Sequence, residues 1–248
     1  MPLLHRTYPG NGSDQTVLGE CLDALGKLHD ALDDGDRRTR PGCRTMVRDG
    51  GSWSEQLELD LDAAGYYTLI SLTLSHSAAQ WALEHAARRG VRKSLGGKLG
   101  DVRAARLRLP VGDAGLDRTL VVVESPELQR GQKRGIAVAL RKAKVELVKL
   151  ERLAAKGRVQ REALEERVRK VLQREHLSEF VVVTVKETGG RVSLHWHVDA
   201  SRRRLLERTR LGRRVLCTDH HNWSNGRIVH AFRRIFAFDQ GSVLAVID

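Results

Sequence analysis

Asp49 is the residue of this chain whose surroundings best suit metal-dependent chemistry. It follows Thr45-Met46-Val47-Arg48, which we expect to form a short strand, and it precedes Gly50-Gly51, which lets the backbone turn away. A carboxylate beyond the end of a buried strand is well placed to bind a hard cation such as Mg²⁺, whose ligands are oxygen atoms. Such sites need several carboxylates that converge from different strands. Because Asp-Gly is also a common turn dipeptide, the alternative interpretation of Asp49 is a turn residue.

Two clusters of basic residues are the candidates for contacts with phosphate groups. The chain holds 43 Lys and Arg against 31 Asp and Glu, which gives a net charge of +12. Residues 1–75 have a net charge of −5, and residues 76–248 have a net charge of +17. A strongly basic balance favours a polyanionic partner, and nucleic acid is the first candidate. Simple solvation is the alternative role for each cluster. The clusters are Arg88, Arg89, Arg92, Lys93 and Lys98, and then Arg202, Arg203 and Arg204.

Histidines and aromatic residues offer a second, competing kind of site. His195 and His197 alternate on one expected strand, and Asp219-His220-His221 follows another, so together they could bind a transition metal. Surface histidines are the alternative, since the sequence does not bring the two groups together. Four aromatic residues could stack on bases or fill the core, and their scarcity favours the core. These are Trp196, Trp223, Tyr66 and Tyr67.

The elements that must position these residues alternate between helix and strand. The strand ending at Arg48 is followed by an expected helix over 54–64 and a strand over 67–74, an order typical of a sheet with crossover helices. Further strands are predicted over 104–109, 119–123, 180–186, 192–198 and 214–218, and helices over 127–155, 158–175, 202–209 and from Ser224 onward. The two long helices, 127–155 and 158–175, should form an antiparallel hairpin. The predicted fold class is α/β.

Several segments, in order, resemble the catalytic core of insertion-sequence DDE transposases. Tyr8-Pro9-Gly10-Asn11-Gly12-Ser13-Asp14 is similar to a loop of that family, and Val47-Arg48-Asp49-Gly50-Gly51 is similar to the segment of its second catalytic aspartate. Ala64 to Ile70 resembles the strand that follows, and Leu211 to Asp219 with Trp223-Ser224 resembles the stretch before the catalytic glutamate. The resemblance extends over nearly the entire chain.

The resemblance implies an RNase-H-like, or retroviral-integrase-like, mixed sheet with flanking helices. The catalytic core would comprise residues 1–80 and 201–248, interrupted over 81–200 by an inserted subdomain that contains the helical hairpin 127–175. Asp49 would be a catalytic ligand of Mg²⁺ or Mn²⁺ in DNA strand cleavage and transfer, with transposon ends and target DNA as partners. Asp239 stands where the family has its glutamate, and Phe232 replaces a tyrosine.

The family's first aspartate precedes the loop at Tyr8, so we expect this carboxylate to be missing and the chain to be a fragment with impaired activity. Asp14 is interpreted as a helix N-cap instead. The rival hypothesis is a basic module that binds DNA or a protein partner without catalysis. A homodimer is an open alternative to a monomer.

The remaining composition bears on where the protein works. Cys21, Cys43 and Cys217 lie far apart, which argues against a disulfide framework and a structural zinc site. There is no apolar run long enough for a membrane span, and the first residues lack the apolar core of a signal peptide. We therefore expect a cytoplasmic protein, associated with the bacterial nucleoid and with no membrane partner.

Overall fold

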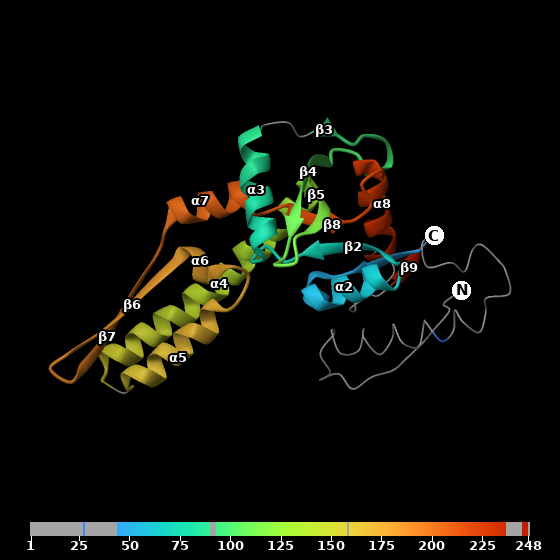
Figure 1. Ribbon diagram of the computed structural model, residues 1–248. Coiled ribbons are helices and arrows are strands. Elements are labelled where there is room, and N and C mark those ends of the chain that lie inside the picture. The colour runs from blue at the N-terminus through green and yellow to red at the C-terminus, as the bar shows by residue number, and fades with distance from the viewer. Residues whose placement is uncertain (1–26, 28–43, 90–92, 158, 237–244, 248) are drawn as a thin grey trace. The chain divides into compact units, whose positions relative to one another are not determined.

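The computed structural model describes residue 27 and residues 44–89, 93–157, 159–236 and 245–247 (Figure 1). The chain divides into two compact units, which are described separately. Unit 1 comprises Met1–Glu124 and Arg214–Asp248, and unit 2 comprises Ser125–Arg213. Unit 2 therefore interrupts unit 1 in the sequence.

Unit 1 is built on a mixed sheet. Within the described residues its strand order is β3-β4-β5-β8-β2-β1-β9, with the two shortest strands at the edges. β1 is parallel to β2, whereas the pairs β1 with β9, β2 with β8, β3 with β4 and β4 with β5 are antiparallel. The strands are β1 (Thr45–Arg48), β2 (Tyr67–Leu72), β3 (Lys93–Ser94), β4 (Arg103–Val111), β5 (Leu116–Glu124), β8 (Arg213–Thr218) and β9 (Ala245–Ile247).

The parallel pair β1 and β2 is connected by the crossover helix α2 (Glu55–Ala63). A short 3₁₀ helix, η3 (Gly50–Ser52), turns the chain directly after β1. The Ser54 side chain accepts a hydrogen bond from the Leu57 backbone N–H at 3.3 Å and so caps the start of α2. Asp49 lies at the carboxyl end of β1, at the start of this β1–α2–β2 connection, as the sequence predicts.

Helices cover both faces of the sheet, and alternate strand residues pack against them. On one face, Ile70 and Val215 share a core with Ala79 and Ala82 of α3 (Ser77–Arg89). On the other face, Leu69 and Leu216 share a core with Phe232 and its neighbours in α8 (Asn225–Phe236). α3 was not predicted from the sequence, because its buried face consists mostly of alanine.

A buried group of charges lies on the α2 face of the sheet. The Arg48 guanidinium donates to Glu58 of α2, and both side chains are only 1% exposed. Arg118 of β5 donates to Glu58 at 3.4 Å and to Asp62 at 3.0 Å. Thr68 of β2 donates its hydroxyl to Glu58 at 3.1 Å. Glu58 thus ties β1, β2 and β5 to α2.

Unit 2 packs helices against a two-stranded ribbon. Its elements are α4 (Pro126–Ala155), α5 (Arg161–Leu172), α6 (Leu177–Phe180), β6 (Val181–Thr188), β7 (Arg191–Val198) and α7 (Ala200–Thr209). β6 and β7 are antiparallel. Leu147 of α4, Leu164 of α5 and Leu194 of β7 are buried in one apolar core. The buried residues of α4 recur at helical spacing along one face, for example Ile136, Leu140 and Leu147.

The two ends of unit 2 are joined to each other. The Ser125 N–H donates to the Gly212 carbonyl at 2.8 Å. Gly212 has a φ of +76°, and a Cβ there would lie 2.6 Å from the Gln129 Cβ, so only glycine fits this close approach. The Ser125 side chain also caps α4 by accepting from the Leu128 N–H at 3.3 Å.

The α/β class with a mixed sheet is confirmed. The boundary of the inserted subdomain differs from the expected 81–200, because β4 and β5 extend the sheet of unit 1 and unit 2 begins only at Ser125. Residues 201–213, which we expected in the last part of the core, belong to unit 2. The described part of the tail, Ala245–Ile247, forms β9.

Candidate nucleic-acid interface

Asp49 lies at the carboxyl end of β1 with an exposed side chain. Its carboxylate accepts a hydrogen bond from the Gly50 N–H at 2.7 Å and caps η3. Gly50 has no room for a side chain, since a Cβ would lie 2.3 Å from the Ser71 carbonyl oxygen at the end of β2. On the other side, Arg48 is fixed by Glu58 and by the Ser52 carbonyl at 3.3 Å. The backbone around Asp49 is therefore firmly held.

The described residues do not make a complete Mg²⁺ site around Asp49. Nowhere in this part of the chain do three Asp, Glu, His or Cys side chains come together in a group that could hold a metal ion. A hard cation in a phosphoryl-transfer site needs more than one carboxylate. The predicted second ligand, Asp239, lies outside the described residues, as do Asp14 and the loop from Tyr8.

The loop after β8 holds one half of the second metal site that we considered, namely Asp219, His220 and His221. The His220 ring is stacked between Tyr67, at 4.1 Å between centroids, and Trp223, at 3.7 Å. Its Nε2 lies 2.6 Å from the Thr45 hydroxyl oxygen. Arg227 extends the stack, with its Cζ 4.1 Å from the Trp223 ring. One ring nitrogen of His220 is thus engaged by a neighbour, and stacking fixes the plane of the ring.

Arg106 of β4 holds the same loop by its backbone. Its guanidinium donates to the carbonyl oxygens of Trp223, at 2.6 Å, and of His220 and His221. The His221 Nδ1 lies 3.0 Å from the Thr119 hydroxyl oxygen. These contacts tie the loop after β8 to β4 and β5.

The pKa values of two groups in this loop are shifted in opposite directions. Burial raises the pKa of Asp219 to about 6, although the hydrogen bond from the Thr68 N–H at 2.9 Å favours the charged carboxylate. Burial also lowers the pKa of His220 to about 4, helped by the positive charge of Arg227. Both groups are therefore held toward their neutral forms.

The other histidines and aromatic residues have ordinary structural places. His195 and His197 are exposed on β7 of unit 2, so they belong to a different unit from His220 and His221. Trp196 and Trp223 are partly buried against the apolar cores of their own units. Tyr66 is 5% exposed, whereas Tyr67 is 39% exposed.

The first predicted basic cluster is spread over separate elements of unit 1. Arg88 is exposed near the end of α3, and Lys98 is exposed in the 3₁₀ helix η4 (Gly97–Leu99). Arg89 is the last residue of α3 and Lys93 is the first residue of β3, but the structure does not describe their side chains. Arg92 lies outside the described residues.

The second predicted cluster is partly neutralised within α7. Arg202 lies 3.4 Å from the Asp199 carboxylate, and Arg203 lies 3.0 Å from that of Glu207. Arg204 is exposed and makes no ion pair with a described residue. A cation that already has a carboxylate partner gives less net attraction to a phosphate, so Arg204 is the strongest of the three candidates.

A more extensive basic surface, which was not predicted from the sequence, lies on α4. Four exposed arginines lie on the side of this helix opposite its buried stripe, and none of them forms an ion pair within the described part of the chain. Helical spacing could have revealed three of them, because no Asp or Glu stands three or four residues away from Arg134, Arg141 or Arg152. We call this surface the arginine face: Arg130, Arg134, Arg141 and Arg152.

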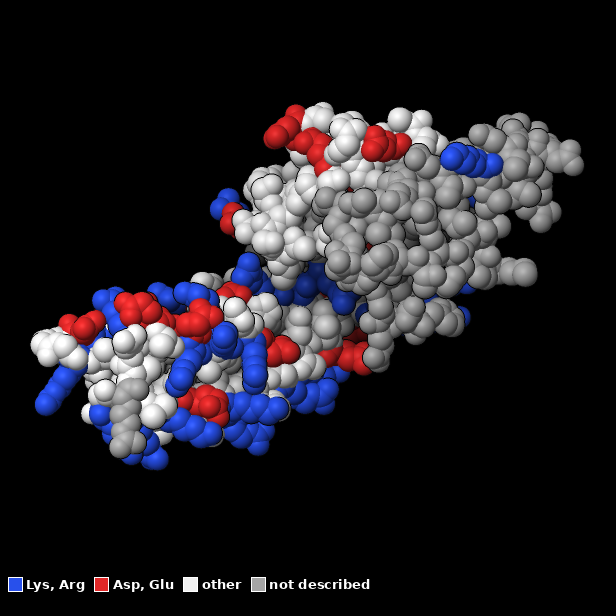
Figure 2. Space-filling model, turned by 90° about the horizontal axis from the view of Figure 1, so that it is seen from below, with Lys and Arg blue, Asp and Glu red and all other residues white. Residues whose placement is uncertain are grey.

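The net charge of the protein resides in unit 2. This unit holds 23 Lys and Arg against 11 Asp and Glu, whereas the rest of the sequence holds 20 of each. Figure 2 shows the Lys and Arg side chains crowded over unit 2. The difference of +12 in unit 2 equals the charge of the whole chain.

Comparisons with known protein families, with characterised proteins and with solved structures find no match. Among the described helices, none has the length and apolar character needed to cross a membrane.

Proposed function

We propose that this protein binds DNA through the arginine face of α4, and that it derives from a DDE-type transposase. The single observation that carries the DNA-binding proposal is the concentration of the entire net charge in unit 2, with four exposed arginines that have no carboxylate partner among the described residues. Arginine binds phosphate oxygens well, because its planar guanidinium donates two parallel hydrogen bonds.

The length of the arginine face suits a polymer better than a small anion. Arg130 and Arg152 are 22 positions apart on one helix, which corresponds to about 33 Å along its axis. Duplex DNA presents a charge about every 1.7 Å along its axis, so several phosphates fall within that length. Contacts of this kind give affinity and orientation without reading base sequence. We therefore expect binding to duplex DNA that is sensitive to salt and insensitive to sequence.

The transposase origin is supported by the place of Asp49. This residue follows a strand that is parallel to its neighbour, at the carboxyl end where a catalytic carboxylate would stand, and a second compact unit interrupts the first later in the chain. The ordered sequence segments around Asp49 and before Asp219 are the other support. The described residues supply one carboxylate at this place and a Mg²⁺ site needs more, so we derive no cleavage step and propose binding without turnover.

The binding proposal is tested by comparing variants that lack arginines without a carboxylate partner with variants that lack cations already in ion pairs. The triple variant Arg130→Gln, Arg141→Gln, Arg152→Gln should lower duplex affinity and reduce the slope of log K against log salt by about 0.9 for each arginine. The measurement is fluorescence anisotropy of a labelled duplex at several salt concentrations.

A matched control removes the same charge from cations that already have carboxylate partners. Lys149→Gln, Arg161→Gln and Arg169→Gln replace residues paired with Glu146, Glu165 and Glu166. This control should leave most of the salt slope in place. Equal loss in both triple variants would show that only net charge matters, and unchanged binding in the first would refute the arginine face.

The catalytic part is tested with Mg²⁺ or Mn²⁺ and a supercoiled plasmid. We expect no strand cleavage by this chain, and we expect Asp49→Ala to leave DNA affinity unchanged because Asp49 lies outside unit 2. Turnover that disappears in Asp49→Ala would contradict the loss of activity while supporting Asp49 as a metal ligand.

A further inference from the structure

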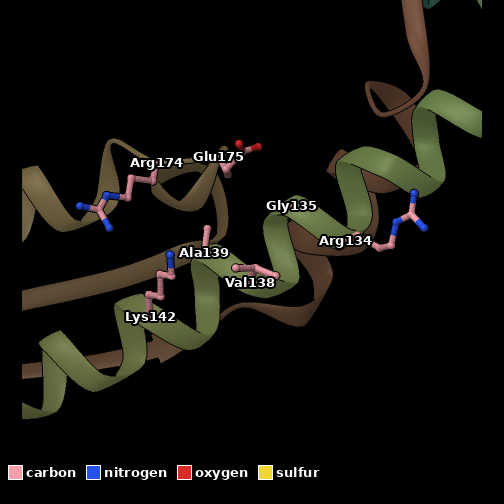
Figure 3. A pocket seen from close by; sticks show the side chains of 7 residues that line it. All are labelled: Arg134, Gly135, Val138, Ala139, Lys142, Arg174 and Glu175. Carbon is pink, nitrogen blue, oxygen red and sulfur yellow. The ribbon is translucent and has the colours of Figure 1, made fainter.

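A groove lies beside the arginine face, where α4 passes the turn between α5 and α6 (Figure 3). Its volume is about 530 Å³ and it is open to solvent. Val138 and Gly135 of α4 form part of its floor, and Arg134 and Lys142 of the same helix stand toward its two ends. Arg174 and Glu175 line it from the turn after α5.

The groove is electropositive. Arg134, Lys142 and Arg174 make no ion pair with any described residue, and Glu175 is the one carboxylate among the residues that line the groove. The cations come from two different elements, so a ligand between them would meet positive charge on both sides. Val138 is 43% exposed, which leaves an apolar surface between the charged ends.

The backbone fixes Glu175 in an unusual position. Glu175 and His176 are the two non-glycine residues of the described chain with positive φ, at 43° and 62°. The bend is held by His176, whose Nδ1 lies 2.7 Å from Glu179, and by Arg210, which pairs with Glu179 at 2.7 Å. The carboxylate lies directly over α4, since a Cβ at Gly135 would be in ordinary contact with the Glu175 Oε2 at 3.4 Å. Strained residues of this kind often belong to ligand sites.

We infer that this groove binds a single, unpaired strand of nucleic acid; this inference rests on the proposed function. A convex row of arginines suits the outside of a duplex, whereas a hollow of this size admits one strand and excludes a duplex. Arg134 binds one phosphate, and Lys142 with Arg174 binds another, about 12 Å further along α4. Between them, a base lies on Val138.

Glu175 gives the groove a preference among bases. A carboxylate accepts hydrogen bonds from the amino group of cytosine, and thymine carries a carbonyl oxygen in that place. When thymine is bound, its carbonyl oxygen and the Glu175 carboxylate repel each other. The carboxylate also gives up a hydrogen bond to water without gaining one from the base. The groove therefore selects cytosine over thymine.

The test compares short oligonucleotides of equal length, all cytosine or all thymine, with a duplex, by fluorescence anisotropy on the full chain. Lys142→Gln and Arg174→Gln should each weaken binding of the cytosine strand by about fivefold. The matched controls are Lys144→Gln and Arg167→Gln, which remove exposed cations of α4 and α5 outside the groove and should weaken it less. Groove variants that behave as these controls would overturn the inference.

Glu175→Gln is the second readout, because glutamine both donates and accepts hydrogen bonds. The unchanged protein should bind the cytosine strand more tightly than the thymine strand, and Glu175→Gln should remove this preference. Equal affinity for both strands in the unchanged protein would also overturn the inference. Duplex binding through Arg130, Arg141 and Arg152 is measured in parallel, so its loss would count against the proposed function and not against the groove alone.

Discussion

Arginine has opposite roles in the two units. In unit 1, Arg48 and Arg118 are buried against Glu58 and tie strands to a helix. In unit 2, the arginine face is exposed and has no carboxylate partner in the described chain. The numbers of positive and negative residues are equal in one unit and differ by twelve in the other. Burial and pairing therefore separate the arginines that support the fold from those available to a ligand.

The largest expected effect comes from breaking the buried pairs of unit 1. Glu58→Ala leaves two buried guanidinium groups without their shared partner, and we expect a loss of about 3–5 kcal/mol in the free energy of unfolding, measured with urea. Arg108→Gln is the control, since its pair with Asp117 is exposed and its removal should leave stability nearly unchanged. Similar stability of both variants would refute the structural role of Glu58.

The stability of unit 2 should depend on its apolar core and not on its surface charges. Leu147→Ala, at a position with no exposed surface, should cost about 2–5 kcal/mol. Val145→Ala, two residues earlier on α4 and 53% exposed, should change stability by less than about 0.5 kcal/mol. Thermal or urea unfolding followed by circular dichroism measures both. Equal losses would mean that α4 is packed differently from the structure described.

A smaller effect is expected from pH, within the loop that follows β8. Asp219 has a raised pKa in the folded state, so the fold binds its proton more tightly and stability falls as pH rises from about 4 to 6. His220 has a lowered pKa, so its contribution to stability rises between about pH 4 and 6.5. The two contributions, each on the order of 3 kcal/mol, oppose each other in the wild-type protein.

Single variants should separate them. Asp219→Asn keeps an acceptor for the Thr68 N–H and should make stability rise with pH over this range, whereas His220→Gln should make it fall. Urea unfolding at pH 4.0 to 6.5, in about half-unit steps, measures the slope of the unfolding free energy against pH for each variant. Slopes of the same sign in both variants would contradict the assigned protonation states.

Local patterns in the sequence predicted most of the elements, because helix caps and apolar spacing act over a few residues. The strand before Asp49, the helix capped by Ser54 and the long helix α4 were all predicted correctly. The boundary of the second unit was not, because membership of β4 and β5 in the sheet depends on pairing between distant strands. The same applies to Arg118, whose partner Glu58 is 60 residues away.

The candidate site was predicted less well than the fold. Asp49 was placed correctly at the end of its strand, but the cluster on α7 was chosen by local density of charge without regard to partners. The arginines of α4 are more widely spaced in the sequence, and they form one surface only because the helix places them on the same exposed side. The groove could not be predicted, since it depends on the left-handed bend at Glu175 and His176.

The hydrogen bond between Ser125 and Gly212 has a consequence for how this protein can be modified. The bond joins Ser125, the first residue of unit 2, to Gly212, the residue before its last, with 2.8 Å between the N and O atoms. Because β5 and β8 are also neighbours in the sheet, the whole unit is inserted in the chain where a loop between two adjacent strands would be. It can therefore be treated as a cassette: a short turn in its place would reconnect the sheet, and the same two ends would accept a foreign domain.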